Sequence, residues 1–241
     1  MNIAQKTVLI TGANRGIGRA LVEEALRRGA KQVYAGTRGP IDFADERVLP
    51  VALDVTNDAQ IEQAVHTVGS LDVLINNSGI APYDDLSNPN VIEQALAVNF
   101  FGMYKVSRAF LPKLVRAKGA LVNNLSLMAL APLPLTPSYA ISKAAALSMT
   151  QSLRALLAVQ GVTVHGVFLG PVDTDMTRGF EIPKASPQSV AEGIFDGLEG
   201  NEEDIFPDEM SRSIADRWRN GLAKAFERQY AGFVPESAAV L

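Results

Sequence analysis

The segment TVLITGANRGIGRALVEEALRRG, residues 7–29, restricts the possible folds more than any other part of the chain. An apolar run leads directly into Gly12, Gly16 and Gly18, and an amphipathic helical pattern follows them. Glycines let the backbone turn tightly and approach a ligand closely, and the first turn of a helix presents free N–H groups. Strand, turn and helix together predict a site for the pyrophosphate of a dinucleotide. The alternative is a glycine-rich turn that holds no ligand.

Short apolar runs alternate with amphipathic stretches along the chain, which is typical of a parallel sheet covered by helices. The pattern predicts strands at residues 7–11, 32–37, 48–55, 71–77, 120–126, 162–170 and 204–207. It predicts helices at residues 16–28, 57–68, 88–116, 138–160, 187–199 and 209–230. Gly29 and Gly161 stand where C-terminal caps are expected, and the connection over residues 38–47 is predicted to hold little or no helix. We find no linker or internal repeat and predict one α/β domain.

The composition disfavours several classes of partner and site. Lys and Arg number 22 against 26 Asp and Glu, a net charge of −4, and the scattered charges disfavour a nucleic-acid surface. The chain has no Cys and two isolated His, which excludes thiolate metal sites and disfavours a His-rich one. The longest apolar run is shorter than the ~20 residues that cross a bilayer, and the first residues do not resemble a signal peptide. We expect a cytoplasmic protein without a membrane partner.

Three segments resemble the short-chain dehydrogenase/reductase family. Residues 11–18 match its TGxxxGxG pattern, and residues 71–79, LDVLINNSG, are similar to its NNAG motif with Ser78 in place of Ala. Asp54 matches the family acid that binds the adenine ring. The resemblance covers nearly the whole chain, to about Met176.

The resemblance implies one Rossmann-type, doubly wound domain over residues 1–241, with a mainly parallel seven-stranded sheet and helices on both faces. Residues 1–125 would mainly hold the cofactor, and residues 126–241 would carry catalysis and substrate binding. The positions that it implies for the cofactor are Gly12, Asn14, Arg15, Gly16, Ile17, Gly18, Thr37, Arg38, Asp54, Val55, Asn77, Ser78, Gly79, Tyr139, Lys143, Gly170, Val172 and Thr174.

The end of the second predicted strand bears on the choice of cofactor. Family members that prefer NAD place an acid there for the ribose 2′-OH, whereas this chain has Thr37 and Arg38. Arg15 lies inside the glycine motif, and two guanidiniums near one 2′-phosphate would give charge-assisted hydrogen bonds. The alternative is two solvated surface arginines. We expect NADP(H).

The catalytic residues are also implied by the resemblance. Tyr139 and Lys143 are four residues apart in a helical pattern, so their side chains share a face. Ser126 and Asn99 stand at the family's spacings before Tyr139. In the family, the tyrosine gives its proton to the carbonyl oxygen, and the serine binds that oxygen. The lysine lowers the tyrosine pKa and holds the ribose, and the asparagine distorts its helix and positions a water.

The segment VHGVFLGPVDTDM, residues 164–176, resembles the family's nicotinamide loop. Leu169 replaces the usual Pro and Pro171 follows the glycine, which leaves the geometry of the turn open. Asp173 and Asp175 could suggest a metal pair, but no third ligand is near and the family uses this loop for nicotinamide. We expect no metal.

The residues expected near the substrate form an apolar set with few charges. They favour an apolar ketone, aldehyde or secondary alcohol over a sugar or an acid. The loop over residues 177–187 is a candidate lid. The set comprises Tyr83, Ser126, Leu127, Met128, Leu130, Leu133, Tyr139, Phe168, Leu169, Met176, Phe180 and Ile182.

The favoured function is an NADPH-dependent carbonyl reductase that also oxidises the alcohol. A 3-oxoacyl-carrier-protein reductase is the second enzyme hypothesis, and the lack of cations between Ser126 and Tyr139 argues against its acidic carrier. A non-catalytic NADP(H)-sensing regulator is an alternative of another class, as is a structural α/β protein. Such regulators usually lose the Tyr or the Lys, and both are present here, whereas a structural protein would not need Ser126, Tyr139 and Lys143 in register.

The resemblance also implies a homodimer or homotetramer, built on the helices predicted at residues 88–116 and 138–160. These helices offer apolar side chains beyond one core-facing stripe, namely Phe100, Phe101, Tyr104, Phe110, Leu147 and Leu153.

Overall fold

Apolar runs of four to six residues form the strands of a central sheet. The computed structural model describes residues 1–234. The strands are β1 (Thr7–Thr11), β2 (Gln32–Thr37), β3 (Val48–Ala52), β4 (Val73–Asn76), β5 (Ala120–Asn124), β6 (Thr163–Val167) and the two-residue β7 (Asp204–Ile205). They lie in the order β3-β2-β1-β4-β5-β6-β7, and every neighbouring pair is parallel. The predicted seven-stranded, doubly wound sheet is confirmed.

The helices begin and end close to the predicted bounds, with two differences. They are α1 (Gly16–Arg27), α2 (Asp58–Thr67), α3 (Pro89–Leu96), α4 (Met103–Ala117), α5 (Pro137–Ala158), α6 (Pro187–Glu199), α7 (Glu209–Arg219) and α8 (Leu222–Ala231). A π-helix, Ala97–Gly102, divides the long helix predicted at 88–116, and short 3₁₀ turns cover Leu127–Ala129 and Asp175–Thr177. The single helix predicted at 209–230 is wrong, because the chain bends at Asn220 and Gly221 between α7 and α8.

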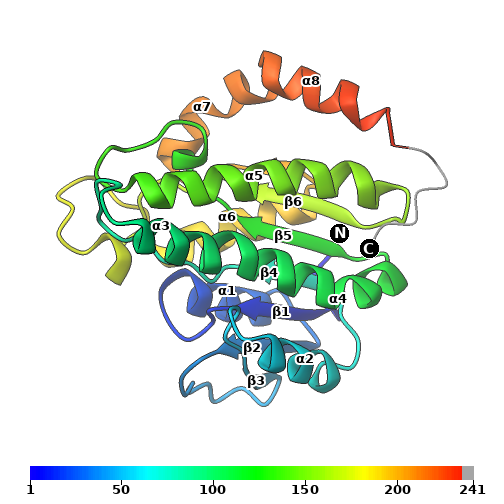
Figure 1. Ribbon diagram of the computed structural model, residues 1–241. Helices are drawn as coiled ribbons and strands as arrows, with labels where there is room; N and C mark the ends of the chain where they lie inside the picture. Colours follow the sequence, from blue (N-terminus) through cyan, green and yellow to red (C-terminus); the bar gives the residue numbers. More distant parts are fainter. Residues whose placement is uncertain (235–241) are drawn as a thin grey trace.

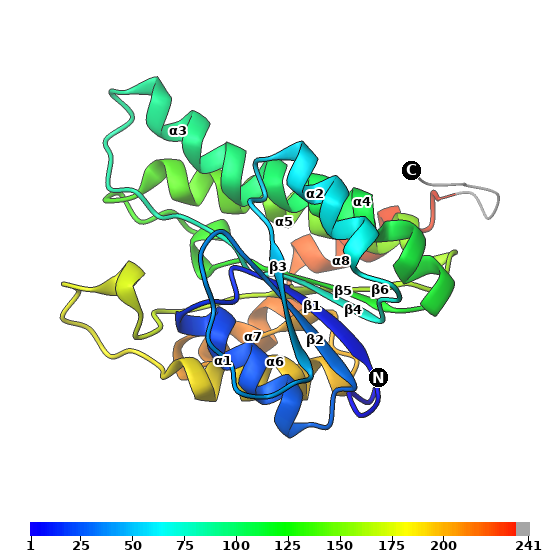
Figure 2. The same cartoon turned by 90° about the horizontal axis from the view of Figure 1, so that it is seen from below.

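Helices cover both faces of the sheet (Figures 1 and 2). Figure 2 shows α1 and α6 on one face and α2, α4 and α5 on the other. Each face has its own apolar core, and a third cluster around Phe168 and Phe206 lies under α7. The strands are buried from both sides, which explains why most of their sequences lack polar alternation.

The two glycines predicted as C-terminal caps lie just after their helices, and a further cap begins α3. Gly29 and Gly161, at φ +81° and +75°, follow the ends of α1 and α5, and Asn88 caps α3 by accepting a hydrogen bond from the Asn90 amide at 3.1 Å. Residues 38–47 contain no helix. Within residues 1–234, no helix combines the length and the apolar character needed to cross a membrane.

Three of the side chains expected at a subunit interface belong to the core of the single chain. Phe110, Leu147 and Leu153 are buried, so the expectation for them is wrong. Phe101 is half exposed, and Phe100 and Tyr104 are partly buried. The helical pattern alone could not separate the buried from the exposed side chains, because α5 carries small or apolar residues on most of its circumference.

The C-terminal helices are fixed to the sheet by buried charges. Asp204 in β7 accepts hydrogen bonds from Arg154 of α5 at 2.7 Å, from Lys224 of α8 at 2.8 Å and from the Trp218 indole at 2.7 Å. Burial alone would raise the Asp204 pKa, but the charges of Arg154 and Lys224 hold it below its ordinary value. Glu227 of α8 pairs with Arg154 and completes the network.

The order of the strands indicates at which edge of the sheet a ligand is expected to bind. The chain builds outward from β1 through β2 to β3, returns to β4 beside β1, and then builds outward to β7. In parallel sheets, ligands bind beyond the carboxyl ends of the strands where the order reverses, which here lies between β1 and β4. The loop before α3 and the loop over residues 170–186 both extend from this edge (Figure 1).

Candidate active site

The glycine turn joins β1 to α1 in a form that only glycine permits. Gly12 and Gly16 have φ values of +66° and +52°, and a Cβ at Gly18 would lie 2.0 Å from the Gly12 carbonyl oxygen. The N-cap residue Arg15 directs its guanidinium to Asp175 rather than capping α1. The first-turn N–H groups of α1 therefore receive no hydrogen bond from the N-cap side chain, as expected of a cradle for a pyrophosphate.

The NNSG segment after β4 is tied to this turn. The Asn77 amide donates to the carbonyl oxygens of Thr11 at 2.9 Å and Gly12 at 3.3 Å. The Thr11 hydroxyl accepts from the backbone N–H groups of Asn77 at 2.9 Å and Ser78 at 3.0 Å. These bonds hold Ser78 and Gly79 beside the glycine turn, where the sequence predicts cofactor contacts.

The ends of β2 and β3 bring Arg38 and Asp54 together. Asp54 accepts hydrogen bonds from the hydroxyl and backbone N–H of Thr56, and these bonds together with the charge of Arg38 hold the Asp54 pKa below its ordinary value. Thr37 is buried and accepts from the Gly39 amide at 3.2 Å, whereas Arg38 is exposed. A cation therefore occupies the edge where an acid would bind a ribose 2′-OH.

Arg15 and Arg38 have different partners in the structure. Arg15 pairs with Asp175 of the loop after β6, with 3.1 Å between Nη1 and Oδ2, and Arg178 pairs with the same carboxylate. The Arg15 and Asp175 side chains are 70% and 49% exposed, so this pair contributes about 0–1 kcal/mol and exchanges readily for another anion.

Ser126 and Tyr139 meet beyond the end of β5. Ser126 caps the short turn after that strand, where its hydroxyl accepts from the Met128 amide at 3.1 Å. Tyr139 stands in the first turn of α5, and its hydroxyl lies near Ser126. Burial raises the pKa of Tyr139, and the nearby Ser126 hydroxyl opposes that rise.

Lys143 lies one turn further along α5 on the same face. Its ammonium is 5.7 Å from the centre of the Tyr139 ring and donates to the Asn124 carbonyl oxygen at 2.7 Å. Burial lowers the pKa of Lys143 to about 8. The two side chains share a face as predicted. Burial raises the pKa of Tyr139 by more than the neighbouring side chains lower it.

Asn99 lies in the π-helix, at the helix distortion that the family resemblance predicts for this position. Its Oδ1 accepts from the Ile80 amide at 2.9 Å, and its Nδ2 donates to the Ile80 carbonyl at 2.8 Å and to the Ser142 hydroxyl at 2.9 Å. The Ser142 hydroxyl donates to the Tyr139 carbonyl oxygen at 2.7 Å. Asn99 therefore connects the loop after β4 to the backbone of the tyrosine.

The loop after β6 passes close to the glycine turn. A Cβ at Gly16 would lie 3.1 Å from the Thr174 methyl group, and Val172 is buried behind it. The Gly170 amide donates to Asp208 at 2.8 Å, and Asp208 also caps α7. Sequence reasoning missed Asp208, although its place at the start of a helical pattern marked it as a cap.

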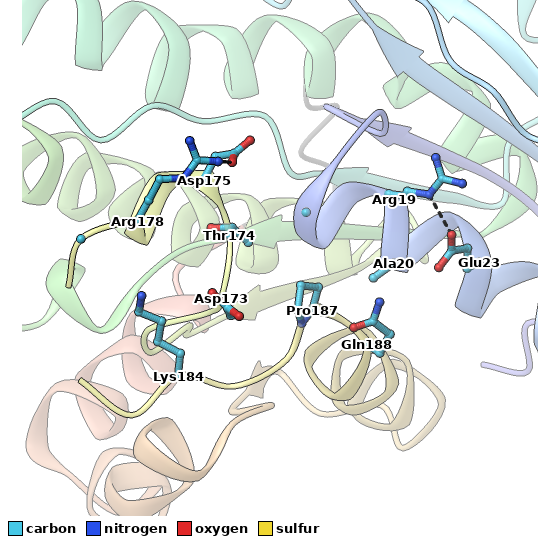
Figure 3. A pocket seen from close by; sticks show the side chains of 12 residues that line it. Arg19, Ala20, Glu23, Asp173, Thr174, Asp175, Arg178, Lys184, Pro187 and Gln188 are labelled. Atoms are coloured by element: carbon cyan, nitrogen blue, oxygen red, sulfur yellow. Dashed lines mark hydrogen bonds and ion pairs between the residues drawn. The ribbon is translucent and has the colours of Figure 1, made fainter. Parts of the chain in front are cut away.

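A pocket of about 530 Å³ opens between this loop, α1 and the start of α6 (Figure 3). Gly16 and Thr174, both expected at the cofactor, line it together with charged side chains from both sides. Figure 3 shows Arg19 paired with Glu23 on α1, and Arg178 with Asp175 on the opposite wall. The pocket is polar and suits the charged part of a nucleotide better than an apolar substrate.

The apolar residues expected at the substrate divide into three groups. Phe168 is fully buried against Phe206 and Trp218, so its assignment to the substrate site is wrong, because it points into the core below the loop. Tyr83 and Phe180 stack with 5.7 Å between their ring centres and connect the loop after β4 to the candidate lid. The other members lie partly or largely exposed near this edge, namely Leu127, Met128, Leu130, Leu133, Leu169, Met176 and Ile182.

Comparison with known proteins agrees with this geometry. The short chain dehydrogenase family profile matches residues 6–184. The chain belongs to this family. Its reaction class is therefore oxidoreduction at CH–OH groups, with a nicotinamide cofactor.

Three relatives indicate the range of the family. The 3-oxoacyl-(acyl-carrier-protein) reductase FabG of Vibrio cholerae is 31% identical over 190 residues, which are 74% of this chain and 78% of that protein. The NADPH-dependent 1-acyldihydroxyacetone phosphate reductase of Schizosaccharomyces pombe is 39% identical over 184 residues, 71% of this chain and 61% of that protein. The structure of a Burkholderia cenocepacia short chain dehydrogenase in complex with NADP superposes with a TM-score of 0.85 at 36% identity, covering 95% and 99% of the two chains.

Proposed function

We propose that this protein is an NADP(H)-dependent carbonyl reductase that also oxidises the corresponding secondary alcohol. The observation that carries the proposal is the joint placement of Ser126, Tyr139 and Lys143 at the carboxyl edge of the sheet, next to the glycine turn. A purely structural α/β protein has no need for this arrangement.

The residues present fit a dinucleotide. The glycine turn leaves no room for a Cβ at Gly18, and the first turn of α1 offers N–H groups to a pyrophosphate. Lys143 would hold the nicotinamide ribose hydroxyls, and Val172 and Thr174 would border the carboxamide. When bound, NADPH supplies the hydride for the carbonyl carbon.

The side chains supply the proton. The Tyr139 hydroxyl gives its proton to the carbonyl oxygen as the new C–H bond forms, so a ketone, NADPH and a proton become an alcohol and NADP⁺. The Ser126 hydroxyl donates a hydrogen bond to the same oxygen and stabilises its developing charge. Lys143 stabilises the resulting phenolate, which regains its proton through Lys143, and a water positioned near Asn99 would replace the proton that Lys143 gives up.

The preference for NADP(H) rests on Arg38 and Arg15. Arg38 is exposed where an acid would select NAD, and Arg15 is held in a weak exposed pair that a 2′-phosphate can replace. The NADPH-dependent yeast relative and the NADP complex of the bacterial relative support this preference.

The substrate class is an apolar ketone, aldehyde or secondary alcohol. The leucines and methionines around the site, and the stacked Tyr83 and Phe180, support this choice. The similarity to FabG favours a second candidate, a 3-oxoacyl thioester on a carrier protein. Leu127, Met128 and the rest of the segment up to Pro137 provide no cation for an acidic carrier.

The test measures kcat/KM for NADPH and NADH with a panel of aryl and alkyl ketones and with a 3-oxoacyl-carrier-protein. We expect NADPH and a ketone to give the highest value. A higher value for the carrier thioester would establish the second candidate. NADPH binding without turnover of any substrate would establish a non-catalytic regulator.

We also propose a homodimer or homotetramer built on α4 and α5. Phe101, in the π-helix that leads into α4, and Ile141 of α5 are 50% and 41% exposed, and these apolar side chains remain for a partner. Light scattering at micromolar concentration tests this, and a strictly monomeric mass would contradict it.

A further inference from the structure

A carboxylate from the loop between β4 and α3 reaches the start of the helix that carries Tyr139. Asp84 accepts a hydrogen bond from the Ser138 hydroxyl at Oδ2 and one from the Ser138 backbone N–H at Oδ1, the latter at 3.3 Å. The Asp84 backbone N–H donates to the Leu135 carbonyl oxygen, also at 3.3 Å. The loop is therefore fastened to the chain on both sides of the point where α5 begins.

The start of α5 needs an acceptor from elsewhere. The first N–H groups of a helix have no partner inside it, and Pro137 in the first turn has none to offer. The N-cap residue Thr136 directs its hydroxyl to the Met128 sulfur at 3.6 Å and makes no capping bond. Ser138 is completely buried, so its donors would be costly to leave unpaired. Asp84 supplies the acceptor, and its negative charge suits the positive end of the helix dipole.

The contact bears directly on Tyr139, which is the residue after Ser138. The other side of Tyr139 is held by the Ser142 hydroxyl, which donates to its carbonyl oxygen and is itself bound by Asn99. Asp84 and Asn99 thus fix the first turn of α5 from two directions. The phenol stands at the end of a long side chain, so a small rotation of this turn moves its hydroxyl relative to Ser126.

We propose that Asp84 is a positioning residue for Tyr139, which acts by fixing the first turn of α5. This rests on the proposed function, in which Tyr139 donates the proton. Misplacement of a reacting group by about 1 Å costs on the order of 100-fold in rate. The effect falls on kcat, because the glycine turn and Lys143 hold the cofactor without Asp84.

The chain provides a matched control in the next residue. Asp85 is exposed, and its carboxylate accepts from the Ser87 amide at 2.9 Å within the same loop. Asp84→Ala and Asp85→Ala remove the same charge from the same loop, but only the first removes the bonds to Ser138. Asp84→Asn keeps an oxygen acceptor for the Ser138 hydroxyl and serves as the rescue variant.

Three quantities are measured for each variant: kcat and KM for the carbonyl substrate, the Kd of NADPH, and amide hydrogen exchange in residues 137–143. Asp84→Ala should lower kcat about 10- to 100-fold, leave the KM and the NADPH Kd within about twofold, and speed exchange in this segment. Asp84→Asn should recover most of kcat, and Asp85→Ala should match the wild type.

The proposal is overturned if Asp84→Ala and Asp85→Ala have the same kcat, or if Asp84→Ala raises KM without lowering kcat. It is also overturned if exchange in residues 137–143 is unchanged, a result that needs no substrate. Failure of the proposed function shows instead in the wild type, which would then reduce no carbonyl. If Asp84→Ala does not fold, Ser138→Ala removes the hydroxyl half of the contact, and an unchanged kcat in that variant decides against the proposal.

Discussion

Replacement of Tyr139 by Phe tests the proposed chemistry most directly. The substitution keeps the ring and removes only the hydroxyl, which lies near Ser126. Ser126 retains its bond from the Met128 amide at 3.1 Å, so the turn after β5 should persist. The fold should therefore be retained, with a change in the free energy of unfolding of less than about 1 kcal/mol.

The expected loss of turnover follows from the two roles of the hydroxyl. General acid catalysis contributes about 10²- to 10⁴-fold, and one donor to a developing oxyanion about 10²- to 10³-fold. Because both come from one group, the contributions are not independent, and a fall in kcat of at least about a thousandfold is expected. The NADPH Kd should stay within about threefold, since the cofactor is held by the glycine turn and Lys143.

Lys143→Met provides the contrast. Lys143 is buried and donates to the Asn124 carbonyl, and the variant loses both the ribose contact and the charge beside the phenol. Turnover and NADPH affinity should both fall. Fluorescence titration of NADPH alongside single-turnover absorbance at the nicotinamide band measures the two effects separately. A Tyr139→Phe protein that keeps more than a tenth of wild-type turnover would show that another group supplies the proton, and the mechanism would be abandoned.

Arg38→Asp should shift the ratio of kcat/KM from NADPH towards NADH by about tenfold or more, because a charged hydrogen bond contributes about 1.5–3 kcal/mol; a wild type that already prefers NADH would refute the assignment. Asp204→Asn should destabilise the protein by about 3 kcal/mol, because it leaves buried cations short of a partner, and urea unfolding measures the change. Burial holds the pKa of His165 below its ordinary value of 6.5. As the pH falls below 6.5, the unfolded chain therefore binds a proton at His165 more readily than the folded chain, and the free energy of unfolding decreases. His165→Gln should flatten this decrease below about pH 6.5, and urea unfolding at a series of pH values measures it.

The sheet and the glycine turn could be predicted because their causes are local. Buried parallel strands read as apolar runs, and the conformations of Gly12 and Gly16 allow few other residues. The break between α7 and α8 was also marked locally, by Asn220 and Gly221, but the helical periodicity on both sides concealed it. An Asn-Gly pair predicts a turn even inside an amphipathic helical pattern.

The partners of charged and aromatic side chains at the site were less predictable. Phe168 follows β6 directly, inside the segment that resembles the nicotinamide loop, yet it points into the core, where it packs against Phe206 and Trp218. Arg15 pairs with Asp175, 160 residues away, and Asp84 with Ser138, 54 residues away. No local pattern encodes such pairs, since they depend on how loops from different strands meet at one edge.

The Asp84–Ser138 and Arg15–Asp175 contacts hold two parts of the candidate active site with different strength. The bonds of Asp84 end on a completely buried serine, and a buried donor left unpaired costs about 1–3 kcal/mol. The Arg15–Asp175 pair is largely exposed and contributes about 0–1 kcal/mol. The helix that carries Tyr139 and Lys143 is therefore held in place, while the loop over residues 170–186 is held to the glycine turn only weakly. A cofactor phosphate that replaced Asp175 as the partner of Arg15 would break this contact between the loop and the glycine turn at a small cost in free energy. The positions of Tyr139 and Lys143 would not change.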